Sequence, residues 1–230
     1  MFYKSIFNVV GVVAVVMAVM FVGCGGKISA SNGEVAASGT ANNEIAQEKS
    51  EAVEPATTFT DTRDGKTYKT VTVGGKTWMA ENLNFAEEGS KCYENNDANC
   101  TKYGRLYDWE TANKACPAGF HLPSDDEWTT LVNYAGGEEN AGKKLKSKAG
   151  WYNNGNGTDD YGWSALPGGV GYSGGGFSGA SNGVNGYWWS ATEDDNTDNA
   201  WRQLMGYSYD YVNRLNDRKT DLYSVRCVED

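Results

Sequence analysis

All eight tryptophans of this 230-residue chain lie between Trp78 and Trp201. Large aromatic side chains supply much of the apolar area that a core buries, so a core is expected where they occur. The segment before them, residues 25–57, has no aromatic residue and consists mainly of Ser, Ala, Asn, Gly and Glu. Such a segment cannot bury enough apolar surface to offset its chain entropy. The sequence therefore predicts one folded domain over residues 58–230, preceded by a flexible tether over residues 24–57.

The first 23 residues have the layout of a secretory signal peptide. Lys4 is followed by a 17-residue, mostly apolar run over residues 6–22, which is the order of charged and apolar regions in such a signal. The run ends at Gly23-Cys24, which resembles the lipobox of bacterial lipoproteins, where the cysteine becomes the acylated N-terminus. A transmembrane anchor is the alternative, because the run nearly reaches spanning length. The cysteine at the boundary favours a signal peptide over residues 1–23 and lipidation of Cys24.

The residue after that cysteine bears on location. Gly25 is not the aspartate that retains similar lipoproteins at the inner membrane. By this resemblance we expect a lipid-anchored protein of the outer membrane or cell surface, whose contact with the membrane is the acyl anchor.

The charge of the predicted domain excludes two classes of partner. Residues 58–230 carry 17 basic and 25 acidic residues, a formal net charge of −8. An acidic surface repels phosphate backbones and anionic headgroups. We therefore expect no nucleic acid partner, and no adhesion of the domain itself to anionic lipid.

Four cysteines follow Cys24, and an even number in an exported domain predicts two disulfides. Three pairings are possible. The favoured one joins Cys92 to Cys100 across a short polar loop and Cys116 to Cys227 across more than 100 residues. A zinc site is the alternative, but the spacings do not suit it and there is no C-x-x-C pair.

Local patterns predict three elements of the domain. Residues 71–83 read as two strands around a Gly74-Gly75 turn. Residues 103–116 have apolar residues at near-helical spacing, which predicts a short amphipathic helix containing Leu106, Trp109, Ala112 and Ala115. Residues 222–230 read as one final strand with Val225 and Cys227 turned inward.

The stretch "HLPSDDEWTTL" (121–131) contains the only histidine of the chain. Ser124 and Glu127 form the Ser-x-x-Glu pattern of a capping box at a helix start, so their polar atoms already have a structural role. His121 lies between apolar neighbours, and no nucleophile motif such as G-x-S-x-G accompanies it. We therefore expect His121 to be a packed, hydrogen-bonded residue and not a catalyst.

Residues 150–190 hold 13 glycines among large aromatic residues. The segment lacks both a G-x-G-x-x-G after a strand and a Walker lysine, so phosphate binding is not expected. It predicts long irregular loops held by aromatic anchors.

Four segments then resemble a known family when taken in order: "GFHLPSDDEW", "DDYGWSALPGG", "YWWSATE" and "YSVRCVED". They are similar to the Fibrobacter succinogenes major paralogous domain. The Leu-Pro-Ser helix start and the Arg-Cys-Val end also resemble formylglycine-generating-enzyme-like domains. This resemblance implies an α+β, C-type lectin-like fold with short helices, small antiparallel sheets and long Gly/Trp-rich loops. It implies a surface protein of a fibre-degrading bacterium, and no established activity comes with it.

The favoured function is a non-catalytic binding or adhesion module for plant polysaccharide or another surface ligand, such as a surface protein. Exposed rings can stack on sugar faces. In a strand, Trp188 and Trp189 face opposite ways, so we expect an exposed ring at this pair. The alternation of Tyr207, Tyr209 and Tyr211 places three further rings on one strand face.

Two other classes are open. The first is a structural envelope lipoprotein without a small ligand. The second is an oxidase of the formylglycine-generating kind, which by resemblance uses a close pair of cysteines that binds copper. Cys92 and Cys100 lie far upstream of where that pair should be, and Cys227 matches a structural position. The oxidase is therefore the weakest of the three, and we expect no enzyme activity.

No cofactor is expected except Ca²⁺, for which there is one candidate site. Sugar-binding C-type lectins hold Ca²⁺ between two short polar motifs, which Glu193, Asp195 and Asn196 and then Asn216 and Asp217 resemble in part. Carboxylate and amide oxygens are the ligands that Ca²⁺ prefers. The motifs lack their proline and tryptophan, so two polar turns on an acidic domain are the simpler interpretation.

Overall fold

The computed structural model describes residues 57–180 and 182–230. The predicted signal peptide, nearly all of the tether and the lipidation site Cys24 lie outside the described residues. None of the helices in the described part is long and apolar enough to cross a membrane.

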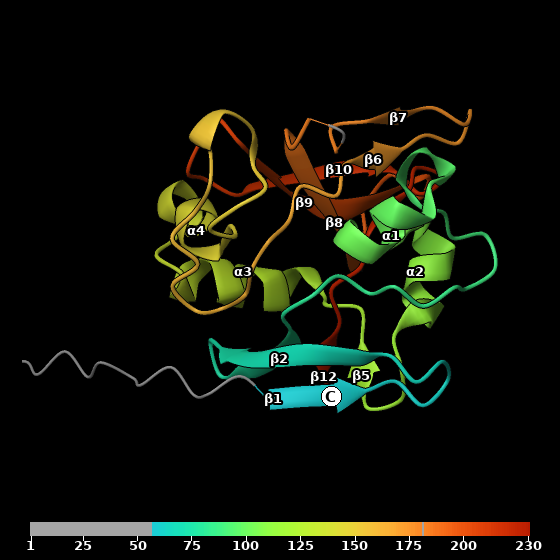
Figure 1. Cartoon of the computed structure of the whole chain (residues 1–230), viewed down its shortest axis with the longest axis horizontal. Coiled ribbons are helices and arrows are strands. Elements are labelled where there is room, and N and C mark those ends of the chain that lie inside the picture. The colour runs from blue at the N-terminus through green and yellow to red at the C-terminus, as the bar shows by residue number, and fades with distance from the viewer. Residues whose placement is uncertain (1–56, 181) are drawn as a thin grey trace, which may run out of the picture. The chain divides into compact units, whose positions relative to one another are not determined.

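The described chain is a mixed α+β structure with two five-stranded sheets and one two-stranded sheet (Figure 1). The first sheet has the order β1 (Thr57–Thr60), β2 (Thr67–Val73), β3 (Lys76–Met79), β12 (Val228–Glu229), β5 (Phe120–His121). The second has the order β10 (Asn213–Arg218), β9 (Asn199–Gly206), β8 (Asn185–Glu193), β11 (Tyr223–Ser224), β4 (Leu106–Tyr107). Strands β6 (Val170–Gly171) and β7 (Phe177–Ser178) form the third.

Short helices accompany the sheets. They are α1 (Asp97–Tyr103), α2 (Trp109–Ala115), α3 (Asp125–Tyr134) and α4 (Glu138–Leu145), with 3₁₀ turns η1 (Tyr93–Asn95) and η2 (Tyr152–Asn154). In Figure 1, β1, β2, β5 and β12 lie in the lower part of the view, and β6 to β10 lie in the upper part.

The predicted hairpin is confirmed. Strands β2 and β3 pair antiparallel, with Val73 opposite Lys76 across a two-residue turn. Gly74 and Gly75 have φ values of 62° and 77°, the left-handed region that such a turn requires at both positions and that glycine adopts without strain. The second strand ends at Met79, earlier than expected.

The predicted helix over residues 103–116 is shorter in the structure. Asp108 caps α2 by accepting a hydrogen bond from the Thr111 amide at 2.8 Å, so the helix begins at Trp109. Leu106 lies in β4 instead, opposite Ser224 of β11. Its helical spacing is coincidental, because a strand buries it equally well.

The predicted final strand is two strands in two sheets. Ser224 pairs in parallel with Trp188 of β8, so this sheet is mixed and not purely antiparallel. Val228 pairs antiparallel with Trp78 and with His121 in the other sheet. The chain passes from one sheet to the other around Arg226. The buried guanidinium of this residue donates hydrogen bonds to the Asn82 side chain and to the Trp163 carbonyl.

The capping box is confirmed. The Ser124 amide donates to Glu127 Oε2 at 2.9 Å, and the Glu127 amide donates to Ser124 Oγ at 3.3 Å. Helix α3 buries Trp128, Leu131 and Val132, as its periodicity predicts.

Tryptophan rings form the centre of the core. Trp78, Trp128, Trp163 and Trp188 form a chain of ring contacts with centroid separations of 5.3 to 6.3 Å. Trp189 belongs to a second cluster. Trp188 and Trp189 thus join different clusters, as adjacent strand residues should, but both rings are 0% exposed. The expectation of an exposed ring at this pair is wrong because apolar side chains cover both faces of β8.

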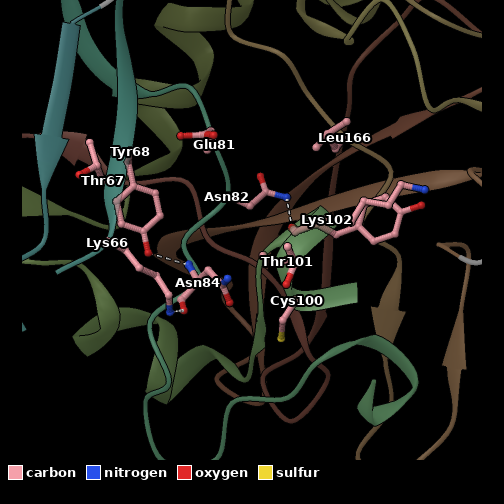
Figure 2. A pocket seen from close by; sticks show the side chains of 12 residues that line it. Lys66, Thr67, Tyr68, Glu81, Asn82, Asn84, Cys100, Thr101, Lys102 and Leu166 are labelled. Atoms are coloured by element: carbon pink, nitrogen blue, oxygen red, sulfur yellow. Dashed lines mark hydrogen bonds between the residues drawn. The ribbon is translucent and has the colours of Figure 1, made fainter. Parts of the chain in front are cut away.

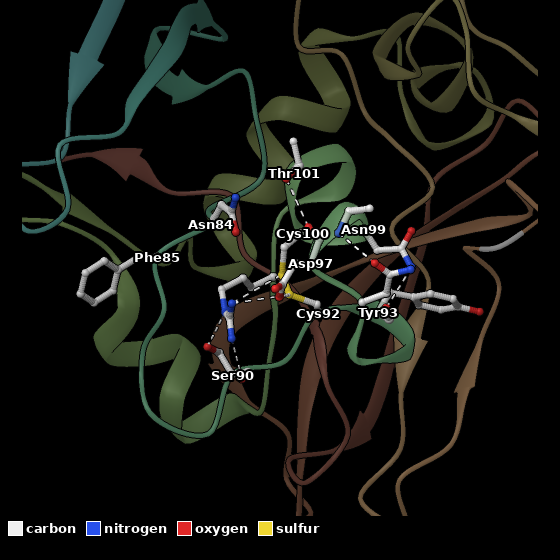
Figure 3. The surroundings of a disulfide bond; sticks show 12 residues. Asn84, Phe85, Ser90, Cys92, Tyr93, Asp97, Asn99, Cys100 and Thr101 are labelled. Atoms are coloured by element: carbon white, nitrogen blue, oxygen red, sulfur yellow. Dashed lines mark hydrogen bonds between the residues drawn. A yellow bond between two sulfur atoms is a disulfide. The ribbon is translucent and has the colours of Figure 1, made fainter.

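Both disulfides have the favoured pairing, Cys92–Cys100 and Cys116–Cys227. The first is shown in Figure 3, where Ser90 lies beside it. Arg105 binds Ser90 through Nε at 2.8 Å and places Nη1 at 3.6 Å from both sulfur atoms. The second disulfide joins the end of α2 to the residue before β12.

Candidate binding site

A cleft lies between the loop after α4 and the turn after β9. It has a volume of about 560 Å³. We call it the tyrosine cleft, and its lining consists of Lys143, Lys146, residues 153–156 and residues 207–210. Of these residues, the sequence pattern singles out only Tyr207 and Tyr209.

Helix α4 holds one wall of the tyrosine cleft in place. The Lys143 amide donates to the Asp210 carbonyl at 2.9 Å, and the Val212 amide donates to the Glu138 carbonyl at 2.9 Å. A side chain at Gly142 would lie 2.5 Å from the Tyr211 carbonyl oxygen. The helix and the turn are therefore in direct backbone contact.

A buried lysine lies beneath this turn. Lys146 is 1% exposed, and its Nζ donates to the Gly206 carbonyl at 3.1 Å and the Tyr209 carbonyl at 2.7 Å. Burial lowers the pKa of Lys146 below its ordinary value, and the charge of Asp210 opposes that effect. The ammonium nitrogen is also 5.4 Å from the Trp151 ring centroid.

The opposite wall is the asparagine-rich loop. Asn153 and Asn154 have φ values of 46° and 59°, a left-handed conformation that asparagine tolerates better than most residues. Asn156 Oδ1 accepts a hydrogen bond from the Trp151 amide at 3.0 Å. A side chain at Gly155 would clash with the Tyr207 carbonyl oxygen. Both walls are thus held by specific contacts, which makes the tyrosine cleft preformed.

The three tyrosines lie in a turn and not on a strand face, so that expectation is wrong. Residues 207–212 connect β9 to β10, because the turn carbonyls bind α4 and Lys146 instead of a neighbouring strand. The Tyr209 and Tyr211 rings stack at 4.0 Å with an interplanar angle of 9°. Tyr207 meets Tyr152 edge to face at 5.2 Å.

Tyr152 and Tyr211 are not lining residues themselves, but their rings contact the lining residues Tyr207 and Tyr209 and keep exposed surface. Tyr152 is 53% exposed and Tyr211 is 37% exposed. Burial raises the pKa of Tyr209 to about 12, and its hydroxyl is protonated and able to donate at neutral pH with or without this shift.

A second, smaller cleft of about 220 Å³ lies between the start of β2, residues 81–84 and the end of α1 (Figure 2). Its polar groups already bind the protein. Lys66 Nζ donates to the Asn84 carbonyl at 2.5 Å, and Asn82 Nδ2 donates to the Tyr103 carbonyl at 2.8 Å. Tyr68 and Tyr103 are each 4% exposed. This cleft therefore offers a ligand few free groups and little ring surface.

The residues of the Ca²⁺ prediction lie at the end of β8, in the turn after it and within β10, and most are already bonded. Glu193 pairs with Lys219, and Asp217 Oδ2 accepts hydrogen bonds from Arg202 and from the Tyr223 hydroxyl. Asn216 binds Asp194 at 2.6 Å.

The remaining two residues of that prediction, Asp195 and Asn196, are exposed. Within residues 57–180 and 182–230, no group of three or more His, Cys, Asp or Glu is arranged to hold a metal ion. Calcium binding therefore stays a prediction, and the observed pairs do not favour it.

His121 is hydrogen-bonded, as its neighbours in sequence suggest. Its Nδ1 lies 2.7 Å from Asp230 Oδ1, and its Nε2 lies 3.0 Å from both carboxylate oxygens of Glu127. Lys76 Nζ also lies 3.0 Å from Glu127. Burial raises the pKa of Glu127, but hydrogen bonds from Ser124, Lys76 and His121 outweigh it and lower the pKa to about 2.

Sequence reasoning misses the asparagine loop and the two lysines of the tyrosine cleft. The run Asn153-Asn154-Gly155-Asn156 contains only residues that tolerate turns and positive φ, and this density is a usable signal. Lys143 and Lys146 have no such signal, because lysines at the end of a helix are usually exposed to solvent.

Comparisons with known proteins complete the description of the site. Residues 71–229 match the family profile of the Fibrobacter succinogenes major domain. Comparison with curated proteins and with solved structures found no match.

Proposed function

This chain belongs to the Fibrobacter succinogenes major domain family, and from that premise we propose that its folded domain is a non-catalytic glycan-binding module. The ligand is a polysaccharide, and the site is the tyrosine cleft. The module belongs to a lipoprotein that Cys24 anchors to the outer membrane at the cell surface.

One observation supports this site above the others: exposed tyrosine rings border a preformed cleft lined with amide side chains. Tyrosine rings offer apolar faces to the C–H faces of sugars, and their hydroxyls are hydrogen-bond donors and acceptors. The amides of Asn153 and Asn154 offer both donors and acceptors to sugar hydroxyls. Preformed walls reduce the ordering cost of binding.

Two arrangements favour binding over catalysis. His121 is held between Asp230 and Glu127, away from the residues that line the tyrosine cleft. All four cysteines of the described part are in disulfides, so none of them is a thiol that could bind copper as an oxidase of the formylglycine-generating kind requires.

We also propose that the fold is a variant of the C-type lectin-like fold. The two sequence pieces that resemble that fold, Leu122-Pro123-Ser124 and Arg226-Cys227-Val228, come together. Val228 pairs with His121, next to Leu122, in one sheet, and the Cys116–Cys227 disulfide ties the same region to α2. The resembling pieces therefore belong to one structural unit.

Retention on insoluble polysaccharide tests the proposal. The full mature protein is mixed with cellulose, xylan or pectin, and the fraction depleted from solution is measured. We expect retention on at least one of them, and at least about a fivefold loss of affinity for Tyr152→Ala and for Tyr211→Ala, since a stacked ring contributes on the order of 1 kcal/mol.

The matched control is Tyr172→Ala. Tyr172 is also exposed, at 41%, but it lies near the β6–β7 turn outside the tyrosine cleft. Its loss should leave retention unchanged, and melting temperatures verify that all three variants fold. Absence of retention on every polysaccharide would favour the alternative of a structural envelope lipoprotein.

A further inference from the structure

The charge of the tyrosine cleft differs in sign from that of the domain around it. The charged residues that line it are Lys143, Lys146 and Asp210, so the lining carries two cations and one anion. Residues 58–230 as a whole have a formal net charge of −8. A cationic cleft on an acidic surface concentrates field lines and selects ligands of negative charge.

The two lysines differ in how they are held. Lys146 is buried, and its ammonium group is bound by two backbone carbonyls, which use two of its three N–H donors. No ion pair to Lys146 is found in the described part of the chain. Its charge therefore depends on neutral oxygens and on the more distant carboxylate of Asp210.

The ion-pair partner of Lys143 can be replaced by a ligand. Its Nζ lies 3.5 Å from Asp210 Oδ2, and the two side chains are 55% and 52% exposed. An exposed pair at this distance is weak because water screens it. A carboxylate on a ligand can take the place of Asp210 beside Lys143 at little cost.

From this geometry we propose that the tyrosine cleft selects an acidic glycan, a polymer of sugars that carry ring carboxylates. Its rings stack on the exposed tyrosines, its hydroxyls meet the asparagine amides, and its carboxylate lies beside Lys143 above the buried Lys146. This inference rests on the proposed function and adds the class of ligand.

The test compares two ligands with one backbone: polygalacturonate and the same polymer after reduction of its carboxyl groups to neutral galactose units. Affinities for the full mature protein are measured by calorimetry. We expect the acidic polymer to bind about tenfold more tightly at low salt, and the difference to fall below about twofold at about 0.5 M NaCl, where the Debye length is short.

Variants locate the preference. Lys143→Gln should reduce binding of the acidic polymer about fivefold, so that its advantage over the neutral polymer falls from about tenfold to about twofold. The matched control is Lys114→Gln, since Lys114 is also exposed in the last turn of a helix, α2. Asp210→Asn should strengthen binding of the acidic polymer, because it removes the competing carboxylate.

The outcomes separate the two proposals. Equal binding of the acidic and neutral polymers overturns the acidic preference and leaves glycan binding intact. Binding of neither polymer overturns the acidic preference, and retention on cellulose or xylan then decides whether glycan binding itself stands. A preference that survives Lys143→Gln unchanged also overturns the inference, because the selectivity then comes from another part of the surface.

Discussion

At the residue scale, the buried charge of Arg226 is stabilised by neutral oxygen atoms and an aromatic ring. Arg226 is 0% exposed. Its Nε and Nη2 donate to Asn82 Oδ1 at 3.1 and 2.9 Å, and Nη1 donates to the Trp163 carbonyl. The guanidinium also lies 3.8 Å from the Trp163 ring centroid. Removing the Asn82 side chain would leave the buried guanidinium without two of its hydrogen bonds. Through these bonds Arg226 connects three segments of the core that are distant in sequence.

Glu127 provides the prediction at this scale. Its pKa is lowered from 4.5 to about 2 in the folded state. A carboxyl with a depressed folded-state pKa contributes stability that is fully present above its unfolded value and is lost as the pH falls toward its folded value. We expect Glu127→Gln to lower the free energy of unfolding by about 1–3 kcal/mol at pH 7.

Urea unfolding between pH 7 and pH 2 measures this effect. The difference between wild type and variant should shrink as the pH falls from about pH 4.5 to about pH 2. Glu110→Gln is the control, because Glu110 is exposed in the first turn of α2. A difference that does not change with pH would contradict the assigned role of the carboxylate.

At the scale of elements, glycine contacts let loops approach each other directly. Gly155 lies against the Tyr207 carbonyl, and Gly142 lies against the Tyr211 carbonyl. These two contacts join the asparagine loop and α4 to the same turn. The shape of the tyrosine cleft therefore depends on backbone spacing, and not only on which side chains line it.

Adding one methyl group to the loop tests this dependence. Gly155→Ala should destabilise the domain by about 1–3 kcal/mol, since the new Cβ cannot fit without moving the backbone. At Gly174 nothing lies within 4 Å of an added Cβ, so Gly174→Ala should be nearly neutral. Thermal melting compares the two variants, and equal effects would mean that the loop shifts freely.

The two disulfides are expected to contribute unequally to the free energy of unfolding. Cys92 and Cys100 are separated by 8 residues, and Cys116 and Cys227 by 111. On the chain-entropy model, the long loop contributes about 5 kcal/mol and the short loop about 2.5 kcal/mol. Replacing both cysteines of each pair by serine, followed by denaturant unfolding, should therefore destabilise the 116–227 variant more. The reverse order would show that contacts near Arg105 outweigh loop entropy.

At the scale of the whole molecule, we expect an acidic folded domain on a tether that starts from a lipid anchor. Cys24→Ala should abolish incorporation of labelled fatty acid, and globomycin should leave an uncleaved wild-type precursor. The measurement is metabolic labelling followed by membrane fractionation. Normal maturation of Cys24→Ala would rule out the lipoprotein, whereas Cys92→Ala serves as a control that leaves labelling intact.

The sequence by itself determines the features that depend on a few neighbouring residues. The Gly74-Gly75 turn and the Ser124–Glu127 capping box are confirmed because each depends on residues at most four apart along the chain. The favoured disulfide pairing is also confirmed, since only three pairings are possible and one of them closes a short polar loop.

Contacts between distant residues are decided only by the tertiary structure. Alternation along the chain shows that Trp188 and Trp189 face opposite sides of a strand, but it does not show that both sides are covered. The turn of Tyr207 to Tyr211 depends on hydrogen bonds to α4, more than 60 residues earlier. Lys146 is the buried cation of a cleft only because carbonyls of that same turn bind it. Such features depend on how separate segments pack, and no local pattern contains that information.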